Sequence, residues 1–454
     1  MTVCAVSTPL AEGGISVIRI SGEKALSIAE RIFRPLSCES VSDMAGYTCA
    51  YGKIVEPESG RAVDEGVLTV FRAPRSYTGE DVCEISCHGG VFVTKKVLRL
   101  CLECGARLAD RGEFTKRAFL NGKLSLTQAE AVMDIISAEG DYALSSANLT
   151  RSGRLFAQIT AIRDSLVGEL ASLAAWVDYP DDDIPAVTED SLKKALSDAD
   201  RELSKLLRDY DSGMILKSGI DTAIVGKPNV GKSTLMNLLL GYDRSIVTDI
   251  AGTTRDVIEE TATLGEYTLR LSDTAGIRTA SDQVEAIGVE LAKKRIDRAM
   301  LILAVFDSSD TLSDEDIELI ELLKGSGKRV IVILNKTDLG SRIESEFEGF
   351  ESLISVSAKT EDCRELIREE VAKLFPVGQF DPDSTVFANE RQKDCVRRAY
   401  EHIRTAEEAL AAGETFDAVT VLISAAADEL LELTGEKATE AVVDEVFSRF
   451  CVGK

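Results

Sequence analysis

Hydrophobic and polar positions change their spacing along the chain, and each spacing predicts a different kind of element. Up to about residue 120, short apolar runs such as 15–20 and 66–71 are separated by turn residues, which predicts mixed strands and helices. The spacing then becomes the i, i+3, i+4, i+7 pattern of an amphipathic helix, at Leu126, Ala129, Val132, Met133 and Ile136. This helical character is expected to continue to Trp176 and to stop at the acidic, proline-bearing stretch that follows.

The centre of the chain alternates apolar runs with helical stretches. Runs at 222–225, 301–306, 330–334 and 353–356 are expected to form a mostly parallel sheet covered on both faces. Before this sheet, a helix over 192–210 is expected to end near Gly213, and after it 390–412 and 418–433 are expected to be helical. Because domain termini often lie close together, we expect the central α/β unit to be inserted into a helical domain.

The chain has 454 residues, which suggests about three domains. We expect a multidomain α/β and all-α protein. Its parts are an N-terminal α+β domain at 1–120, a first helical segment at 121–215, the inserted α/β domain at 216–378 and a second helical segment at 379–454.

Composition excludes several classes of protein. With 44% hydrophobic and 28% charged residues, the chain is neither disordered nor collagen-like, and it has enough apolar material for more than one core. Its net charge of −25 excludes a strongly basic nucleic-acid coat, so RNA contact needs a local basic patch or a partner. One candidate patch comprises Lys95, Lys96, Arg99, Arg107, Arg111, Lys116, Arg117 and Lys123, although a solvated helix face is the simpler interpretation.

The remaining general features point to the cytoplasm. The N-terminal sequence does not resemble a signal peptide, and the longest apolar run, at 299–306, is far shorter than the roughly 20 residues of a membrane helix. The ten cysteines lack paired zinc-type spacing and are expected to be reduced thiols. Cys101 and Cys104 are expected to be buried thiols, or thiols whose spacing has no functional meaning. His88 is expected to be a turn residue rather than a ligand.

The strongest motif is GKPNVGKS at 226–233. It matches the phosphate-binding pattern G-x-x-x-x-G-K-[ST], and it follows an expected strand and precedes an expected helix. Its backbone N–H groups and the helix N-terminus favour a phosphate group. Lys232 is expected to reach the β- and γ-phosphates, and the Ser233 hydroxyl to bind Mg²⁺.

Three further motifs follow at strand ends, in the order of a guanine-nucleotide domain. They are DTAG at 273–276, NKTD at 335–338 and SAK at 357–359. The Asp338 carboxylate can accept hydrogen bonds from both N–H donors of guanine, which adenine lacks. The sequence therefore predicts a Ras-like GTPase domain that binds GTP and Mg²⁺.

The first switch loop is expected at 248–256, where Thr254 completes the Mg²⁺ ligands. The position of the water-orienting Gln of many Ras-like GTPases holds Ile277, which cannot orient water, so Asp282 and Glu285 are the candidates. The residues expected to bind GTP are Asn229, Val230, Gly231, Lys232, Ser233, Thr234, Thr248, Asp249, Ile250, Ala251, Gly252, Thr253, Thr254, Asp273, Thr274, Ala275, Gly276, Asn335, Lys336, Asp338, Ser357, Ala358 and Lys359.

Together with TDIAGTTRD, DTAGIR and the terminal FCVGK at 450–454, these motifs resemble the MnmE (TrmE) family of tRNA-modifying GTPases over essentially the whole chain. The resemblance implies a homodimer formed through N-terminal domains that bind a tetrahydrofolate derivative, 5-formyl- or methylene-tetrahydrofolate. It also implies a flavoprotein partner, MnmG, which carries FAD and forms a heterotetramer or larger complex. Together the two proteins would add an aminomethyl or carboxymethylaminomethyl group to C5 of the wobble uridine of certain tRNAs.

The resemblance also implies roles for particular residues. The folate site would use Arg19, Glu84 and Lys123, with Lys454 as a further candidate. A K⁺ ion that activates GTP hydrolysis would be held by Asn229, Thr248, the Ile250 carbonyl and Thr253. Glu285 matches the carboxylate that positions water, and Cys451 is a candidate nucleophile.

Two other functions fit parts of the sequence. A GTP-dependent ribosome-assembly factor shares the PNVGKS loop and the TTRD switch, but not the N-terminal 120 residues or the FCVGK tail. A membrane-remodelling GTPase would need a basic amphipathic or transmembrane segment, and the sequence does not suggest one.

Overall fold

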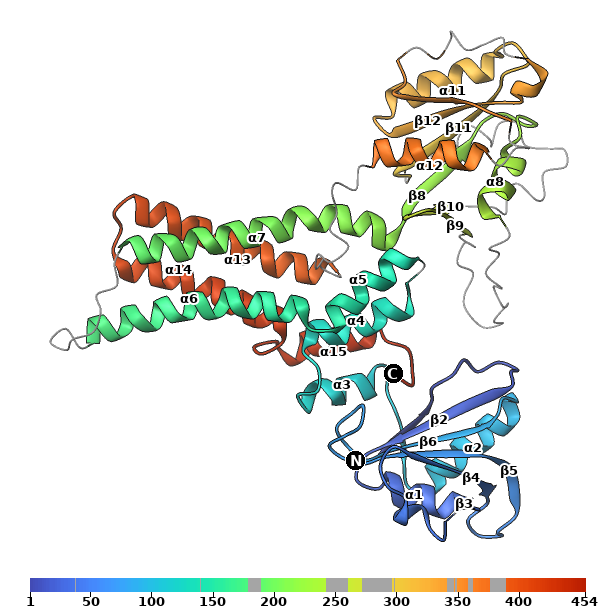
Figure 1. Ribbon diagram of the computed structural model, residues 1–454, viewed down its shortest axis with the longest axis vertical. Coiled ribbons are helices and arrows are strands. Elements are labelled where there is room, and N and C mark those ends of the chain that lie inside the picture. Colours follow the sequence, from blue (N-terminus) through green and yellow to red (C-terminus); the bar gives the residue numbers. More distant parts are fainter. Residues whose placement is uncertain are drawn as a thin grey trace. The chain divides into compact units, whose positions relative to one another are not determined.

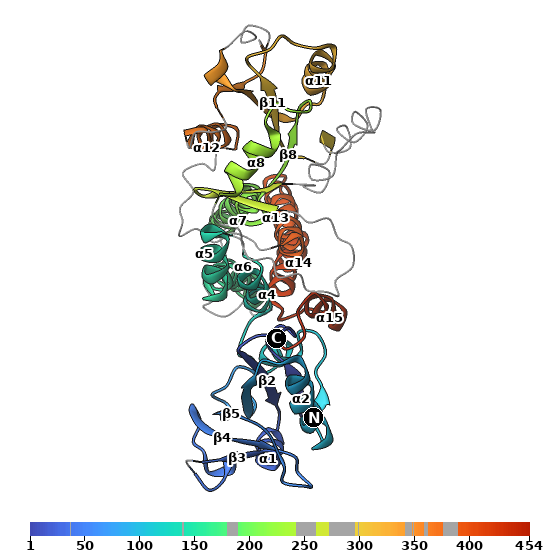
Figure 2. The same ribbon diagram turned by 90° about the vertical axis from the view of Figure 1, so that its right-hand side faces the viewer.

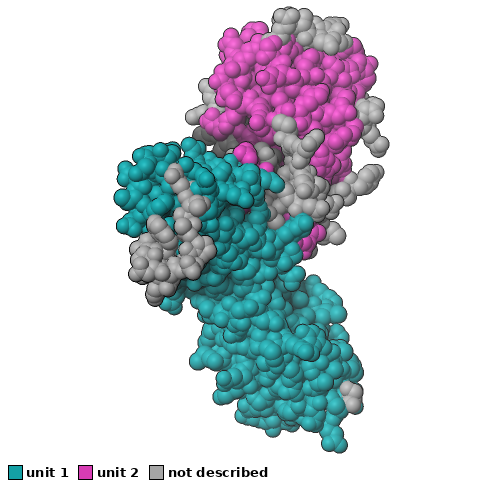
Figure 3. Space-filling model, turned by 60° about the vertical axis from the view of Figure 1, so that its left-hand side comes forward, with its two compact units in different colours: residues 1–133, 149–205, 388–454 teal, residues 134–148, 206–387 magenta. Residues whose placement is uncertain are grey.

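The computed structural model describes residues 1–36, 38–138, 140–178, 189–241, 260–271, 296–297, 299–340, 347, 349–357, 362–375 and 389–454. The chain forms two compact units, which are coloured separately in Figure 3. Unit 1 comprises 1–133, 149–205 and 388–454, and unit 2 comprises 134–148 and 206–387. Each unit therefore contains segments that are far apart in the sequence.

A seven-stranded sheet begins unit 1, in the order β3-β4-β5-β6-β2-β1-β7. All neighbouring strands are antiparallel except β1 and β7. The strands are β1 (Val3–Val6), β2 (Ile15–Ser21), β3 (Phe33–Pro35), β4 (Thr48–Val55), β5 (Ala62–Phe71), β6 (Val82–His88) and β7 (Arg107–Leu108).

Side chains alternate between the two faces of this sheet. Inward residues such as Ile18, Ile20 and Ile85 form one core with helices α1 (Ala25–Ile32) and α2 (Val91–Glu103). Val41, the first residue of the short 3₁₀ helix η1 (Val41–Asp43), is buried in the same core. The register places Arg19 opposite Glu84, and the alternation turns both away from the helices.

The helices of unit 1 come from two stretches of the chain, one before and one after the six-stranded sheet of unit 2, and their colours differ accordingly in Figures 1 and 2. The first set is α3 (Glu113–Leu120), α4 (Leu126–Ile136), α5 (Asp141–Arg151), α6 (Arg154–Asp178) and α7 (Glu189–Ser218), with α4, α5 and α7 extending into the residues of unit 2. The second set is α13 (Glu390–Ala411), α14 (Phe416–Thr434) and α15 (Glu440–Ser448). Helix α14 packs against both α13 and α6, so the two sets share one bundle.

A buried ion pair also joins the two sets. Glu130 of α4 is 7% exposed and accepts hydrogen bonds from Arg391 of α13 through both carboxylate oxygens, at 2.9 and 2.8 Å. The neighbouring Gln392 donates to the same carboxylate at 2.5 Å. A buried charge is stable only when paired and hydrogen-bonded, so this contact holds α4 to a helix more than 250 residues later in the chain.

Unit 2 contains a six-stranded sheet in the order β13-β12-β11-β8-β10-β9. Its strands are β8 (Ile220–Val225), β9 (Glu260–Leu264), β10 (Tyr267–Leu271), β11 (Leu301–Asp307), β12 (Arg329–Asn335) and β13 (Ser352–Ser355). All pairs are parallel except β9 with β10. Helices α8 (Lys232–Leu240) and α12 (Asp362–Leu374) share one core with this sheet, and α11 (Asp314–Gly325) shares another on the opposite face.

Several expected elements differ from the observed ones. The helical character expected from Ser125 to Trp176 is present, and it is divided among the three helices α4, α5 and α6; the break between α5 and α6 includes Gly153, where φ is +89°. The predicted end of a helix near Gly213 is wrong, because α7 continues to Ser218. A single glycine costs a helix only about 1 kcal/mol, which the rest of a 30-residue helix can offset. Strand β9 and helix α15 were not expected.

Within the part of the chain that the structure describes, no helix combines the length and apolar character that crossing a membrane requires.

Candidate functional site

The phosphate-loop motif connects β8 to α8. Gly226 has φ of +144°, and a Cβ there would lie 2.3 Å from the Val305 carbonyl oxygen. Gly231 has φ of +102°, and its Cβ would lie 2.1 Å from Asn335 Nδ2. Asn229 also lies in the left-handed region, with φ of +65°. The loop can therefore pass close to the neighbouring strands only with glycine at its two ends.

The Lys232 side chain folds back over this loop. Its ammonium donates to the carbonyl oxygens of Gly226 and Lys227, both at 2.6 Å. Ser233 and Thr234 follow in the first turn of α8, where backbone N–H groups have no partner within the helix. This arrangement offers one ammonium, one hydroxyl and several N–H donors to an anionic ligand.

The NKTD motif lies at the end of β12, beside the phosphate loop. Asn335 is buried, and its Nδ2 donates to the Val230 carbonyl at 2.7 Å. Lys336 has φ of +64°, and its ammonium lies 2.5 Å from Oδ2 of Asp307 at the end of β11. Partial burial would raise the pKa of Asp307, but hydrogen bonds from Lys336 and Ser309 outweigh it and hold the pKa below its usual value.

A pocket of about 270 Å³ lies between these motifs. It is lined by residues of the phosphate loop, the NKTD motif and the SAK motif and by two residues that directly follow the first two motifs, Thr234 and Leu339; the motif residues are Gly231, Asn335, Lys336, Asp338 and Ser357. The structure thus brings together predicted GTP-binding residues that are more than 100 residues apart in the chain.

Other predicted residues of this site lie outside the described part of the chain. They are Thr248, Asp249, Ile250, Ala251, Gly252, Thr253, Thr254, Asp273, Thr274, Ala275, Gly276, Ala358, Lys359 and both candidate water-positioning residues, Asp282 and Glu285.

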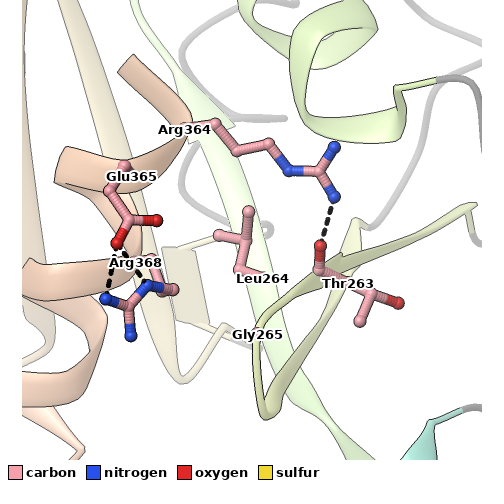
Figure 4. A pocket seen from close by; sticks show the side chains of 6 residues that line it. All are labelled: Thr263, Leu264, Gly265, Arg364, Glu365 and Arg368. Atoms are coloured by element: carbon pink, nitrogen blue, oxygen red, sulfur yellow. Dashed lines mark hydrogen bonds and ion pairs between the residues drawn. The ribbon is translucent and has the colours of Figure 1, made fainter. Parts of the chain in front are cut away.

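A second pocket in unit 2, of about 200 Å³, contains none of the predicted residues. It lies between the β9–β10 turn and α12, as Figure 4 shows. Arg364 donates to the Thr263 carbonyl, and Arg368 pairs with Glu365. Both guanidinium groups are therefore engaged in contacts within the wall of the pocket.

In unit 1, the tail 450–454 docks against the N-terminal sheet. The Gly453 carbonyl accepts hydrogen bonds from Ser7 Oγ and Arg19 Nη1, each at 3.2 Å. Val452 forms a β-bridge with Arg111, and the Lys454 carbonyl accepts from the Phe114 N–H at 3.2 Å. Phe450 is buried in a cluster with residues of α4 and α15, which anchors the start of the tail.

The tail brings Lys454 to the pair formed by Arg19 and Glu84. Arg19 Nε donates to Glu84 Oε1 at 2.8 Å, and its guanidinium lies over the rings of Tyr77 and Phe114, at 5.6 and 5.4 Å. Burial and the nearby Arg19 lower the pKa of Lys454, and Arg151 contributes in the same direction. This cluster, called the tail site below, combines cations, a carboxylate and two aromatic rings.

Three of these residues were not found from the sequence: Tyr77, Phe114 and Arg151. No motif marks them, because they meet only when distant segments pack. Lys123 does not join the cluster through any of its described contacts, since its ammonium donates to the Pro74 carbonyl at 3.1 Å. Cys451 is exposed, and its backbone carbonyl accepts a hydrogen bond from the Gly112 N–H at 3.4 Å.

Other predicted features of unit 1 can also be placed. Cys101 and Cys104 are both buried. His88 ends strand β6 rather than lying in a turn, and its Nδ1 lies 2.7 Å from Asp64.

Four of the eight cations of the candidate basic patch have acidic partners among the described contacts. Lys96 pairs with Glu56, Lys116 with Asp444, Arg107 with Asp110 and Glu113, and Arg117 with Glu80 and Glu113. These contacts favour the structural interpretation of the patch.

Comparison with known proteins covers both units. The model of the MnmE helical domain matches residues 126–451, and that of the GTP-binding protein TrmE N-terminus matches residues 2–123. The chain is 43% identical over 457 residues to the tRNA modification GTPase MnmE of Lactobacillus delbrueckii subsp. bulgaricus, covering 100% of this chain and 98% of the relative. It is 44% identical over 458 residues to the protein of that name from Clostridioides difficile, covering 100% and 99%. The chain belongs to the MnmE (TrmE) family of tRNA modification GTPases.

As a member of this family the chain is a GTPase, which implies GTP and Mg²⁺ as ligands. Both regions that flank the GTPase domain match MnmE (TrmE) models, and a ribosome-assembly factor would not explain that match. The chain is also similar to a solved structure of a single-residue variant of Aquifex aeolicus Era bound to GDP and AlF₄⁻. That match has 30% identity and a TM-score of 0.28, and covers 40% of this chain and 66% of the other.

Proposed function

We propose that this protein is a K⁺-activated GTPase that acts with a flavoprotein partner, MnmG, on the wobble uridine of certain tRNAs. The two proteins would add an aminomethyl or carboxymethylaminomethyl group at C5, with the one-carbon unit taken from a tetrahydrofolate derivative. FAD would be carried by the partner, and the protein would act as a homodimer. The observation that carries the folate part of this proposal is the tail site.

The chemistry of the tail site fits a folate. A pterin ring carries N–H groups that can donate hydrogen bonds to a carboxylate such as Glu84. Its planar face suits contact with the ring of Tyr77 or Phe114. The glutamate tail of a folate is anionic, and Arg19, Arg151 and Lys454 offer cations to it. Each of these side chains is described in unit 1, with Arg19 at the centre of the contacts.

The gathering of cations in the tail site supports the proposal that this site binds an anionic ligand. The lowered pKa of Lys454 means that burial and neighbouring cations oppose its charge, and Glu84 offsets only part of this effect. An anion bound beside Lys454 would offset the repulsion from Arg19 and Arg151 and so favour the charged ammonium. Cys451 lies at the exposed edge of the same tail, where a nucleophilic role for its thiol remains a separate proposal.

In the GTPase domain, Lys232 would exchange its two backbone carbonyl partners for phosphate oxygens. The Ser233 hydroxyl and Thr254 would hold Mg²⁺, which supplies positive charge at the phosphates. Asp338 would select guanine, because its carboxylate can accept hydrogen bonds from both N–H donors of that base. Glu285 would position the attacking water, in place of the Gln found in many Ras-like GTPases.

The K⁺ ion would be held by oxygen ligands of Asn229, Thr248, Ile250 and Thr253. Asn229 is the one of these four that the structure describes, at a positive φ in the phosphate loop. A cation at this position would add charge beside the phosphates, as an arginine finger does in other GTPases.

Nucleoside analysis of tRNA from a strain that lacks this gene tests the proposal directly. We expect the C5 modification of the wobble uridine to disappear and to return when the wild-type gene is supplied. Separate complementation with Arg19→Ala and Lys232→Ala would test the two sites, and both should fail to restore the modification. Unchanged wobble uridines in the deletion strain would reject the proposal and favour a role in ribosome assembly.

A further inference from the structure

An acidic segment that connects β11 to α11 contacts two nucleotide motifs without belonging to either. It runs from Asp307, the last residue of β11, to Asp316 in the first turn of α11. At its first residue, Asp307 holds Lys336 of the NKTD motif. At its last residue, Asp316 holds Lys227 of the phosphate loop, with Nζ 2.8 Å from Oδ2.

Asp316 is buried more deeply than its role in the helix cap requires. It forms a capping box with Ser313, in which Oδ2 accepts from the Ser313 N–H at 2.9 Å and from its hydroxyl at 2.7 Å. The side chain is only 2% exposed, and its second oxygen, Oδ1, is buried without a hydrogen-bond partner among the described residues. A capping box works equally well at the surface, so capping alone does not explain a buried carboxylate.

Lys227 connects this carboxylate to Lys232. The Lys227 side chain is 20% exposed and reaches Asp316, while its backbone carbonyl accepts a hydrogen bond from Lys232 Nζ at 2.6 Å. The hydrogen bond to Asp316, together with the charges of Asp316 and Asp310, raises the pKa of Lys227, so its ammonium stays charged. One residue therefore links a buried acid in α11 to the predicted phosphate-binding lysine.

We propose that Asp316 is a positioning residue for the phosphate loop, and that it acts by anchoring Lys227. This inference rests on residues 226–233 being the phosphate loop. An anchored loop is ordered before the nucleotide arrives, so binding does not bear the entropy of ordering it. Because the loop contacts the ground state and the transition state alike, loss of the anchor should raise KM for GTP and leave kcat nearly unchanged.

The test compares variants of the full-length protein by binding of a fluorescent GDP analogue and by KM and kcat for GTP. Asp316→Asn keeps an oxygen for the Ser313 cap but loses the charge that holds Lys227. Lys227→Met keeps the aliphatic stem and loses the ammonium, which serves if Asp316→Asn fails to fold. We expect each variant to weaken GDP binding by about tenfold, as loss of one charged hydrogen bond would, with kcat within about twofold.

Three further variants separate positioning from stability. The double variant should bind GDP no more weakly than either single variant, since both remove one interaction. Lys227→Arg should restore most of the affinity. Ser313→Ala removes the other half of the capping box, so it should lower the unfolding temperature without weakening GDP binding.

The inference is overturned if Asp316→Asn and Lys227→Met bind GDP like the wild type, if their effects add fully, or if Ser313→Ala weakens binding as much as they do. Lys232→Ala checks the assignment of the loop itself. If that variant binds GDP and hydrolyses GTP normally, residues 226–233 are not the phosphate loop. If it is inactive while the Asp316 variants bind normally, the positioning role alone is wrong.

Discussion

The phosphate loop of unit 2 and the tail site of unit 1 are built in opposite ways. In the loop, the Lys232 ammonium contacts the carbonyls of Gly226 and Lys227, all within seven consecutive residues, so these contacts follow from the local backbone. In the tail site, the contact between Arg19 and Gly453 joins residues 434 positions apart. The first site is formed by one turn between a strand and a helix, with distant contacts to Asp316 and to the NKTD motif, whereas the second depends on the docking of a whole segment.

This difference predicts how each site fails. A substitution in the phosphate loop should remove GTP chemistry and leave the rest of the protein intact. A substitution that displaces the tail should remove ligand binding in unit 1 and leave GTP hydrolysis unchanged. We therefore expect GTP hydrolysis and the proposed folate binding to be lost separately.

The largest effect is expected for Lys232→Ala. Loss of its ammonium removes charge stabilisation at the phosphates, and GTP hydrolysis should fall by roughly 10²–10³-fold. Steady-state phosphate release measures this, and binding of 5-formyl-tetrahydrofolate to the same variant should be unaffected. The matched control is Lys324→Ala, which removes an exposed lysine of α11. Equal losses of folate binding and hydrolysis in Lys232→Ala would show that the two sites are not separable.

A second prediction concerns the buried ion pair that connects the two sets of helices in unit 1. Glu130→Ala would leave Arg391 without its buried partner, and the free energy of unfolding should fall by about 3 kcal/mol. Urea unfolding measures the change. Glu408, whose side chain is 72% exposed, offers the control, and Glu408→Ala should change stability by less than about 0.5 kcal/mol. Similar changes in the free energy of unfolding for the two variants would mean that this ion pair does not stabilise the packing of the two sets of helices.

The third prediction tests the tail with a single methyl group. Gly453 has φ of +97°, and a Cβ there would lie 2.3 Å from the Val6 carbonyl oxygen, so Gly453→Ala should displace the tail. We expect binding of 5-formyl-tetrahydrofolate to weaken by at least about tenfold, with GTP turnover unchanged. Gly168→Ala is the control, because that glycine lies in α6 with open space around it. Normal folate binding by Gly453→Ala would contradict the proposed role of the docked tail.

The smallest expected effect distinguishes Arg19 from Lys123. The family resemblance places both residues in the folate site. Arg19 lies at the centre of the tail site, whereas Lys123 contacts the Pro74 carbonyl. Arg19→Ala should weaken folate binding by about tenfold or more, and Lys123→Ala by less than about threefold. Isothermal titration of both variants decides the matter, and a larger loss for Lys123→Ala would restore it to the site.

The same contrast explains what could be predicted from the sequence. The strands β8, β11, β12 and β13 and the GKPNVGKS loop were predicted, because a buried parallel strand and a glycine-bounded turn have local sequence patterns. Strand β9 was not, since its five residues become a strand only by pairing with β10 at the sheet edge.

Contacts between residues far apart in the chain have no comparable local sequence pattern. The sequence shows that Lys96 and Lys116 are basic, but not that Glu56 and Asp444 neutralise them. It likewise gives no sign that Tyr77 and Phe114 flank Arg19. Those contacts depend on the packing of distant segments, which periodicity along the chain does not record.

The most direct test of the tail site is a titration of 5-formyl-tetrahydrofolate into the wild-type protein and into a variant that ends at Phe450. Phe450 remains to fill its buried cluster, so unit 1 should stay folded while Gly453 and Lys454 are lost. We predict saturable binding to the wild type, at least about tenfold weaker binding to the shortened variant, and equal GTP turnover by both. No binding to the wild type, or equal binding to both proteins, would contradict the account.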